Sequence, residues 1–281
     1  MRQVLATLQL IRTVNCLLAM VGVWIGAYMT WSAPIWLDPL LAGLVAFLVC
    51  AAGNIINDRL DIEIDRVNHP RRVLVQGKLS IRFAARLAIV LNVVALAIAL
   101  LVNYLVFLVA LAALGLLMAY NFYLKRIPLL GNLIIAVLGG LTFITGGLAV
   151  DVVATASLPG PLIPAVYALL FHLVREIVKD VQDIDGDRAA GLTTFPMVAG
   201  VRTALLTALL LFLVLVLLTY VPIVAGWFGY WYRVITVYVV DLPILALLIL
   251  VWGNPTRNML AIGSNVLKVG MALGVVALLL A

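Results

Sequence analysis

The chain has 281 residues, of which 66% are hydrophobic and 11% are charged, and its mean hydropathy is +1.23. Because about a quarter of the residues in a soluble globular domain are charged, this composition excludes that class and predicts an integral membrane protein. The formal net charge of +6 does not indicate a nucleic-acid-binding protein, since the Lys and Arg residues lie mostly at the ends of apolar runs and beside acidic clusters.

Successive apolar runs, each near the roughly 20 residues that cross a hydrocarbon core, predict an all-α integral membrane protein. We expect a single transmembrane domain over residues 1–281, built as a bundle of nine transmembrane helices. Only Asn103 separates the third span from the fourth, and Pro243 is expected to kink the eighth. The expected spans are 13–33, 36–57, 82–102, 104–122, 129–150, 160–179, 202–224, 232–252 and 260–280.

The first apolar run lacks a small-residue cleavage pattern and is long enough to span, so we expect a retained helix and not a signal peptide. Cys16 and Cys50 both lie inside apolar runs, which favours packing roles over a disulfide or a zinc site.

The positive charges predict the orientation of the spans, because short cytoplasmic loops carry the excess of Lys and Arg. With the N-terminus inside, every one of the 18 Lys and Arg residues except Arg233 falls on the cytoplasmic side, with Lys268 about two turns into the ninth span from that side. This distribution predicts a multi-pass protein of the cell membrane whose N-terminus is cytoplasmic.

An acidic stretch at 54–72 ends the second span. Asn54, Asp58, Asp61 and Asp65 are spaced by four, three and four residues, which places them on one face of a regular helix. Such a face is a candidate cation site.

A second acidic stretch at 175–188 ends the sixth span and repeats the pattern with Asp180, Asp183 and Asp187. Both stretches lie on the expected cytoplasmic side, and they are four spans apart. This repetition predicts two pseudo-repeated halves, one built around each acidic stretch.

The two stretches hold nine of the 12 acidic residues, and so much like charge at a membrane surface is unfavourable unless cations neutralise it. Oxygen ligands suit Mg²⁺, which is usually held by one or two carboxylates together with substrate phosphates. The sequence therefore predicts a phosphorylated substrate, and the cationic residues beside the acids are expected to contact the remaining phosphate oxygens. Those residues are Arg66, Arg72, Lys125, Lys179 and Arg188.

These residues resemble the motifs of the UbiA superfamily of intramembrane prenyltransferases. The first family motif, NDxxDxxxD, is matched by Asn57, Asp58, Asp61 and Asp65, and the second, DxxDxxxD, by the three aspartates at 180–187. The Tyr and Lys that the family carries between the fourth and fifth spans correspond to Tyr120 and Lys125. Within the superfamily, the two stretches are most similar to the geranylgeranylglyceryl phosphate geranylgeranyltransferases of ether-lipid synthesis.

The resemblance implies a Mg²⁺-dependent prenyltransferase that moves an isoprenyl group, here geranylgeranyl, from its diphosphate to a lipophilic acceptor. It also implies two Mg²⁺ ions that bridge the aspartates to the diphosphate, and an apolar bundle that holds the prenyl tail beside membrane lipid. The Tyr120 ring would either orient the diphosphate or face the allylic cation. The implied metal ligands are Asn54, Asp58, Asp61, Asp65, Asp180, Asp183 and Asp187, and the implied catalytic residues are Asp58, Asp61, Asp180, Asp183, Lys125 and Tyr120. The implied substrate-binding residues are Asn54, Asn57, Arg66, Arg72, Lys179, Arg188, Asn15 and Asn132.

Several polar residues near the expected site have two readings. Arg12 and Asn15 begin the first span one turn apart and either face a pocket or, for Arg12, anchor the span at the membrane interface. Asn132, at the start of the fifth span, makes either an interhelical bond or a pocket contact. We interpret Glu176 as a structural partner of the adjacent Arg175. The segment 67–80 is the expected cover of a bound diphosphate.

Two alternative functions remain. One keeps the prenyl donor and replaces the acceptor by an aromatic ring, as in quinone or haem precursor synthesis. The other is a cation transporter, because intramembrane acids often mark ion paths. The acids cluster at one face of the membrane, however, and the outer half of the spans is expected to offer little polar lining, which favours the enzyme.

Overall fold

The structure is a computed structural model that describes residues 2–30, 36–189 and 191–281. In this part of the chain all regular elements are helices. The helices of the first half are α1 (Arg2–Leu10), α2 (Thr13–Tyr28), α3 (Leu37–Leu60), α4 (Ile62–Asn68), α5 (Ile81–Val102), α6 (Tyr104–Phe122), the short 3₁₀ helix η1 (Leu124–Arg126) and α7 (Leu130–Leu148). Those of the second half are α8 (Val152–Ala156), α9 (Leu162–Ala189), α10 (Phe195–Ala199), α11 (Val201–Val224), α12 (Tyr230–Val234), the π-helix η2 (Ile235–Asp241), α13 (Leu242–Gly253) and α14 (Arg257–Leu279).

The boundary at Asn103 is confirmed and has a clear local cause. Asn103 has extended backbone angles, and its side chain accepts a hydrogen bond of 2.9 Å from the backbone N–H of Val106, which caps α6. Its Nδ2 also donates to the backbone oxygen of Leu148 at 3.0 Å, which ties this turn to the end of α7. One polar residue is therefore enough to divide a long apolar run into two helices.

The eighth span contains a π-helix just before the proline that was expected to kink it. Pro243 lies in the first turn of α13, directly after η2. Proline has no N–H and its ring crowds the preceding turn, so a regular α-helical bond pattern cannot run through this point. The wider π turns of η2 end at Asp241 and place that acid inside the span.

Among the residues that the structure describes, seven helices are long and apolar enough to cross a membrane: α3, α5, α6, α7, the continuous segment Tyr230–Gly253, α11 and α14. A broken eighth is formed by α1 and α2, which bend by 53° at Arg12, where the backbone is left-handed. The sequence did not predict α1. Helix α9 is not one of these helices, because its second half is rich in charged residues. The count of nine spans therefore remains a prediction. The fold is that of a multi-pass membrane protein.

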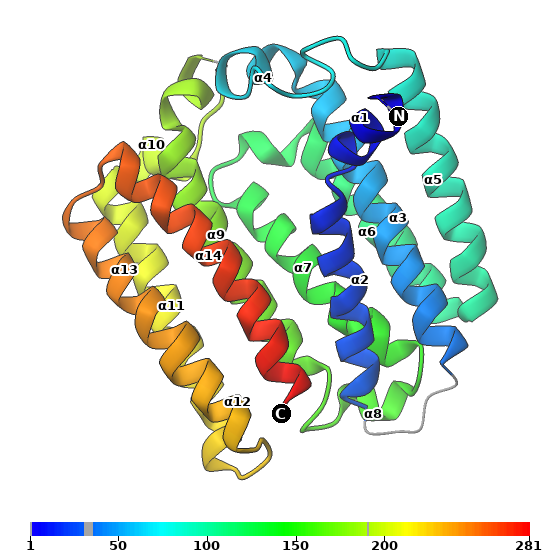
Figure 1. Ribbon diagram of the computed structural model, residues 1–281, viewed down its shortest axis with the longest axis vertical. Coiled ribbons are helices and arrows are strands. Elements are labelled where there is room, and N and C mark those ends of the chain that lie inside the picture. Colours follow the sequence, from blue (N-terminus) through cyan, green and yellow to red (C-terminus); the bar gives the residue numbers. More distant parts are fainter. Residues whose placement is uncertain (1, 31–35, 190) are drawn as a thin grey trace.

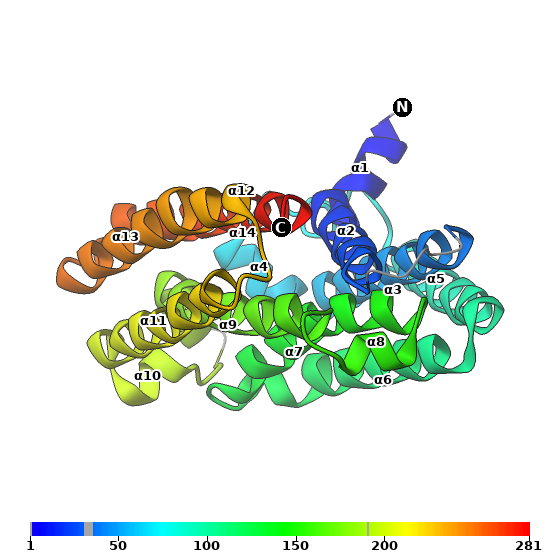
Figure 2. The ribbon, with the colours of Figure 1, turned by 90° about the horizontal axis from the view of Figure 1, so that it is seen from below.

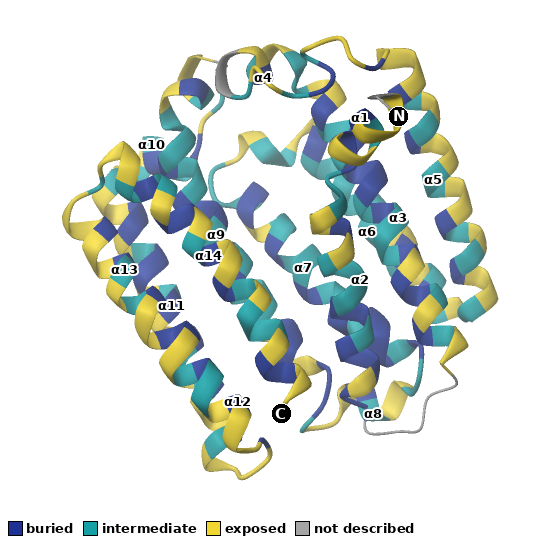
Figure 3. Cartoon of the chain, in the orientation of Figure 1, coloured by how far each residue is buried: buried dark blue, intermediate teal, exposed yellow. Residues whose placement is uncertain are grey.

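Figures 1 and 2 show two groups of long helices joined through α7 and α9. Buried side chains of α2, α3, α5 and α6 form one hydrophobic cluster, and those of α9, α11, α13 and α14 form another. Figure 3 shows exposed residues along the outer faces of α5 and α13, and many of these are apolar, such as Leu101 and Leu250. Such faces suit contact with lipid tails. The short helices α4 and α10 lie at one end of the bundle, and α8 and α12 at the other (Figure 1).

Helices α2 and α7 are held unusually close by glycines. A Cβ atom on Gly146 would lie 1.8 Å from the backbone oxygen of Val23, and one on Gly26 would lie 2.0 Å from that of Phe143. Backbone atoms cannot move aside as a flexible side chain can, so only glycine fits at these two positions.

We therefore expect Gly146→Ala to destabilise the bundle by about 1–3 kcal/mol, the usual effect of overpacking. Equilibrium unfolding in mixed detergent micelles would measure this change. Gly115→Ala in α6 is the matched control, because its added Cβ would meet no atom within 4 Å. Equal stability of the two variants would contradict the close contact of α2 with α7.

Candidate functional site

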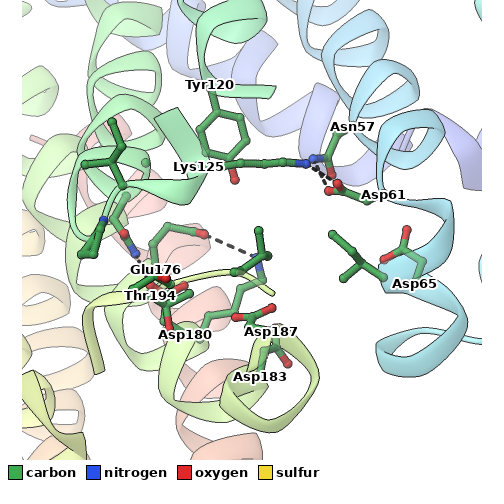
Figure 4. Close-up of a pocket in the computed structure, with 18 of the residues that line it drawn as sticks. Asn57, Asp61, Asp65, Tyr120, Lys125, Glu176, Asp180, Asp183, Asp187 and Thr194 are labelled. Carbon is green, nitrogen blue, oxygen red and sulfur yellow. Dashed lines mark hydrogen bonds and ion pairs between the residues drawn. The ribbon is translucent and has the colours of Figure 1, made fainter. Parts of the chain in front are cut away.

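The two acidic stretches meet around one polar cavity of about 120 Å³ at the end of the bundle that carries α4 and α10. Asp61 and Asp65 line it from the α3–α4 side, and Asp180, Asp183 and Asp187 line it from α9. Figure 4 shows the two sets on opposite walls, with Tyr120 and Lys125 nearby. The fold thus brings together carboxylates that are more than 100 residues apart.

The first acidic stretch is not one continuous helix, so the prediction of a single four-residue face is wrong. Helix α3 ends at Leu60, and Asp61 (φ −96°, ψ 14°) separates it from α4. Asp61 accepts a hydrogen bond of 2.9 Å from the Asn57 side chain and pairs with the Lys125 ammonium group. The break places Asp65 on α4 and Asp61 at the junction between α3 and α4.

Two arginines hold the other carboxylates of this stretch. Arg12 donates to Asp58 at 2.5 Å from the break between α1 and α2, and Arg72 donates to Asp58 at 2.9 Å. Arg72 also donates to Asp65 at 2.5 Å. The side chains of Asp58 and Asp65 are 5% and 4% exposed, so these pairs are shielded from water. Asp58, which the sequence assigned to metal binding and catalysis, thus binds two arginines and lines neither cavity as the described residues define them, whereas Asp65 also faces the polar cavity.

The second acidic stretch keeps its expected helical face on α9. Asp180 accepts a hydrogen bond of 2.8 Å from the Asn132 side chain of α7. Asn132 thus makes the interhelical bond and also lies in a pocket, because both partners of this bond line the polar cavity. Glu176, one turn before Asp180, pairs with Arg175 at 2.6 Å and with Lys179 at 3.4 Å.

Burial changes the acidity of the carboxylates that lie beyond the spans. It raises the pKa of Asp65 to about 6, although the nearby Arg72 opposes the shift. Burial, with a smaller contribution from Asp183, also raises the pKa of Asp187 to about 6. Two carboxylates of the cavity therefore bind protons more readily than ordinary aspartates.

A second, larger cavity of about 460 Å³ extends from the polar one into the bundle and is lined mostly by apolar side chains. The two cavities share Asn57, Arg72, Tyr120, Glu176 and Lys179. These five residues mark the junction between a charged chamber and an apolar one. A molecule with an anionic head and a hydrocarbon tail would fit across this junction.

Some predicted site residues do not reach the carboxylates. Asn54 donates to the backbone oxygen of Ile11 at 2.9 Å and lines only the larger cavity in the part of the chain that the structure describes. Arg66 pairs with Glu63 on the exposed surface at 2.7 Å, and Arg188 is exposed at the end of α9. Asn15 lines the larger cavity. In the described part of the chain, the lining of the polar cavity therefore does not include Asn54, Arg66 or Arg188.

Two further residues line the cavities, although the sequence did not predict this position for either. Glu176 pairs with Arg175 as expected, but it also lines both cavities. Asp241 is buried, lines the larger cavity and accepts a hydrogen bond of 2.9 Å from Thr219. An acid inside an apolar run is itself a signal of function.

The end of the larger cavity away from the acidic stretches has polar lining. Thr219, Tyr232, Thr236 and Asp241 lie there, and the Tyr232 hydroxyl donates to the backbone oxygen of Thr219 at 3.2 Å. The sequence predicted little polar lining in the outer half of the spans, and these four residues are polar lining that it did not predict. Asp241 is the last residue of the π-helix η2.

The carboxylates do not form a closed metal cage. Over residues 2–30, 36–189 and 191–281, no three His, Cys, Asp or Glu side chains converge closely enough to hold an ion by themselves. Mg²⁺ does not require such a cage, because it retains waters and shares its coordination sphere with substrate phosphates. Asp61, Asp65, Asp180, Asp183 and Asp187 are thus a set of oxygen donors that fits Mg²⁺ in company with a diphosphate.

Comparison with known proteins gives a consistent result. Residues 17–262 match the model of the UbiA prenyltransferase family. The digeranylgeranylglyceryl phosphate synthase of Methanopyrus kandleri is 35% identical over 275 residues, which cover 98% of each chain. That of Halobacterium salinarum is 38% identical over 229 residues, or 80% of each chain.

Two solved structures are similar in fold. One, from work on digeranylgeranylglyceryl phosphate synthase in membranes, is 32% identical, has a TM-score of 0.77 and covers 99% of this chain and 98% of its own. The other is a UbiA homologue from Archaeoglobus fulgidus bound to GPP and Mg²⁺, with 22% identity and a TM-score of 0.64, which covers 97% of this chain and 99% of its own.

Proposed function

The chain belongs to the UbiA prenyltransferase family, and from this premise we propose that it transfers a geranylgeranyl group from its diphosphate to geranylgeranylglyceryl phosphate. The observation that carries the proposal is the junction of an acid-lined polar cavity with a larger apolar one. A prenyl diphosphate has the same division between head and tail. We further propose that this polar end of the bundle faces the cytoplasm, as the Lys and Arg distribution predicts.

Mg²⁺ would be held by Asp61 and Asp65 on one wall and by Asp180, Asp183 and Asp187 on the other, and we propose two ions. When bound, Mg²⁺ supplies positive charge that stabilises the negative charge that develops on the leaving diphosphate. The oxygen-only character of this donor set supports the choice of a hard cation.

The basic side chains of the polar cavity and the apolar walls of the larger cavity have separate roles. Lys125, Arg72 and Lys179 line the polar cavity, where they contact phosphate oxygens and stabilise the departing charge. The larger cavity holds the prenyl tail and keeps water from the allylic carbon. Tyr120 lies where the two cavities meet, next to the bond that breaks. The acceptor hydroxyl oxygen bonds to that carbon, diphosphate leaves and the hydroxyl proton is released.

Purified protein in lipid vesicles, supplied with Mg²⁺ and radiolabelled geranylgeranyl diphosphate, tests the proposal directly. Geranylgeranylglyceryl phosphate and aromatic carboxylic acids would be offered in parallel as acceptors. We expect labelled product with the glyceryl phosphate. Product only with an aromatic acceptor would reassign the reaction, and absence of product with every acceptor would rule out prenyl transfer.

The raised pKa values of Asp65 and Asp187 predict that the Mg²⁺ concentration required for activity depends on pH. A carboxylate must lose its proton to bind Mg²⁺, and a pKa of about 6 means that this form is lost as the pH falls from 7.5 to 5.5. Over this pH range, the Mg²⁺ concentration that gives half of the maximal rate should rise about fourfold if the ion needs Asp65 or Asp187 as a ligand. A ligand with the ordinary aspartate pKa of about 3.9 would give almost no change. Initial rates over a Mg²⁺ series at each pH measure it, and a flat profile would contradict the proposed ligands.

A further inference from the structure

We propose that Lys268 of α14, together with Arg175 of α9, binds the phosphate group of the amphiphilic acceptor in the larger cavity. This inference rests on the proposed function, since it assigns a position to the acceptor of that reaction. It separates the binding of the acceptor phosphate from the binding of the donor diphosphate.

Lys268 lies deep in an apolar helix. It is 11 residues beyond Arg257, where α14 begins, and at 1.5 Å per residue this distance is about 16 Å along the helix axis. The side chain lines the larger cavity, and the residue is exposed. A lysine at this depth is unfavourable in hydrocarbon unless it faces a polar ligand or a partner.

The other basic side chains of the two cavities already have acidic partners. Arg12 and Arg72 pair with Asp58, and Lys125 pairs with Asp61. Arg175 and Lys179 share Glu176. Among the described residues, no acid lies within salt-bridge distance of Lys268.

Basic side chains outnumber acidic ones around Lys268. Arg175 and Lys179 are its positive neighbours, and Glu176 and the more weakly acting Asp183 are the carboxylates that oppose them. Three cations thus face two carboxylates, of which Glu176 is already paired with Arg175 and Lys179. Like charges inside an apolar bundle repel unless an anion lies between them. Arg175 would offer a planar fork to a phosphate, and Lys268 a mobile point charge.

The position of this pair favours the acceptor over the donor. As far as the described residues define the cavities, Lys268 and Arg175 line the larger one alone, whereas the carboxylates for the diphosphate line the polar one. Glu176 and Lys179 line both cavities, so the pair lies next to the junction at Tyr120. A glycerol phosphate held there would lie beside the junction that the proposed donor occupies.

The route of an acceptor from the membrane is consistent with this placement. Helix α14 lies beside α2 in both Figures 1 and 2, and residues of both helices line the larger cavity. Asn15 of α2 is, like Lys268, an exposed residue that lines the larger cavity. The polar groups therefore lie on the two helices that bound this side of the cavity, with apolar walls behind them for the tails.

Lys268→Gln is the first test, with Lys268→Arg as the charge-conserving variant. Loss of a charge-assisted hydrogen bond should raise KM for geranylgeranylglyceryl phosphate about tenfold or more, with KM for the donor unchanged. Lys268→Arg should stay within about threefold of the unsubstituted protein. Arg257→Gln, an exposed charge at the start of the same helix, is the control for a general loss of positive charge and should leave both constants unchanged.

A phosphate-free acceptor distinguishes phosphate recognition from other effects. The unsubstituted protein should prefer geranylgeranylglyceryl phosphate over geranylgeranylglycerol, and Lys268→Gln should lose about tenfold of that preference. An increase in donor KM alone would assign Lys268 to the diphosphate and overturn the proposal. An unchanged acceptor KM, coupled to a lost dependence on anionic lipid in the vesicles, would show that Lys268 binds a membrane lipid headgroup, and would also overturn it.

Binding without turnover separates this inference from the proposed function. Calorimetric titration of the acceptor into the protein, without donor or Mg²⁺, should show binding that Lys268→Gln weakens about tenfold. This result would support the phosphate site even if no product formed. Equal binding by the variant, or no binding by the unsubstituted protein, would reject the site even if prenyl transfer occurred.

Discussion

Asp61→Ala is expected to lower the rate of prenyl transfer by about 10³-fold at saturating substrate, while the bundle remains folded. The carboxylate lines the polar cavity and joins Asn57 to Lys125. Its removal takes away one proposed ligand of Mg²⁺ and leaves the Lys125 ammonium group without its acid. Loss of one preorganised electrostatic group at a reacting centre commonly costs about 10²–10³ in rate, and the loss of a metal ligand adds to it.

Steady-state rates in vesicles, with size-exclusion profiles to confirm folding, measure this effect. Glu63→Ala is the matched control, because Glu63 lies two residues further along, is 78% exposed and pairs only with the surface residue Arg66 in the described part of the chain. Asp180→Ala makes the same test on the opposite wall, where Asn132 would lose its partner. Near-normal rates in both cavity variants would exclude these carboxylates from the reaction.

The apolar runs alone predicted most helix boundaries. The expected fourth span, 104–122, coincides with α6, and the spans at 82–102 and 202–224 each differ from α5 and α11 by one residue at one end. These boundaries depend on local composition and capping, which a sequence shows directly. The sequence did not predict α1, because the bend at Arg12 that separates α1 from α2 is stabilised by an ion pair with Asp58, 46 residues away.

The site shows the same division between local and long-range causes. Spacing identified the aspartates, because motif and period are local properties of the chain. It could not show that the helix breaks at Asp61, since Lys125 and Arg72 hold the two sides of that break from other segments. Nor could it show that Asn54 turns toward the backbone of Ile11. Contacts between distant segments decide which polar atoms face the cavity.

Arg72→Met is expected to reduce both stability and activity, because Arg72 bridges two buried carboxylates. It donates to Asp58 at 2.9 Å and to Asp65 at 2.5 Å, and its own side chain is 23% exposed. Removing one partner of a buried ion pair leaves an uncompensated charge, which costs about 3–5 kcal/mol. Equilibrium unfolding in mixed micelles at pH 8, where Asp65 is ionised, would measure the loss. Arg66→Met is the matched control, since its exposed pair with Glu63 should contribute less than about 1 kcal/mol.

The double variant Arg72→Met with Asp65→Asn separates the two effects of that substitution. Because it removes one buried carboxylate together with its cation, and Arg12 still pairs with Asp58, most of the lost stability should return. Activity should not return, because Asp65 also lines the polar cavity as a proposed Mg²⁺ ligand. Stability that stays low in the double variant would mean that Arg72 acts through contacts other than these carboxylates. Activity that recovers with stability would exclude Asp65 as a ligand and leave Asp61 as the metal-binding residue of the first stretch.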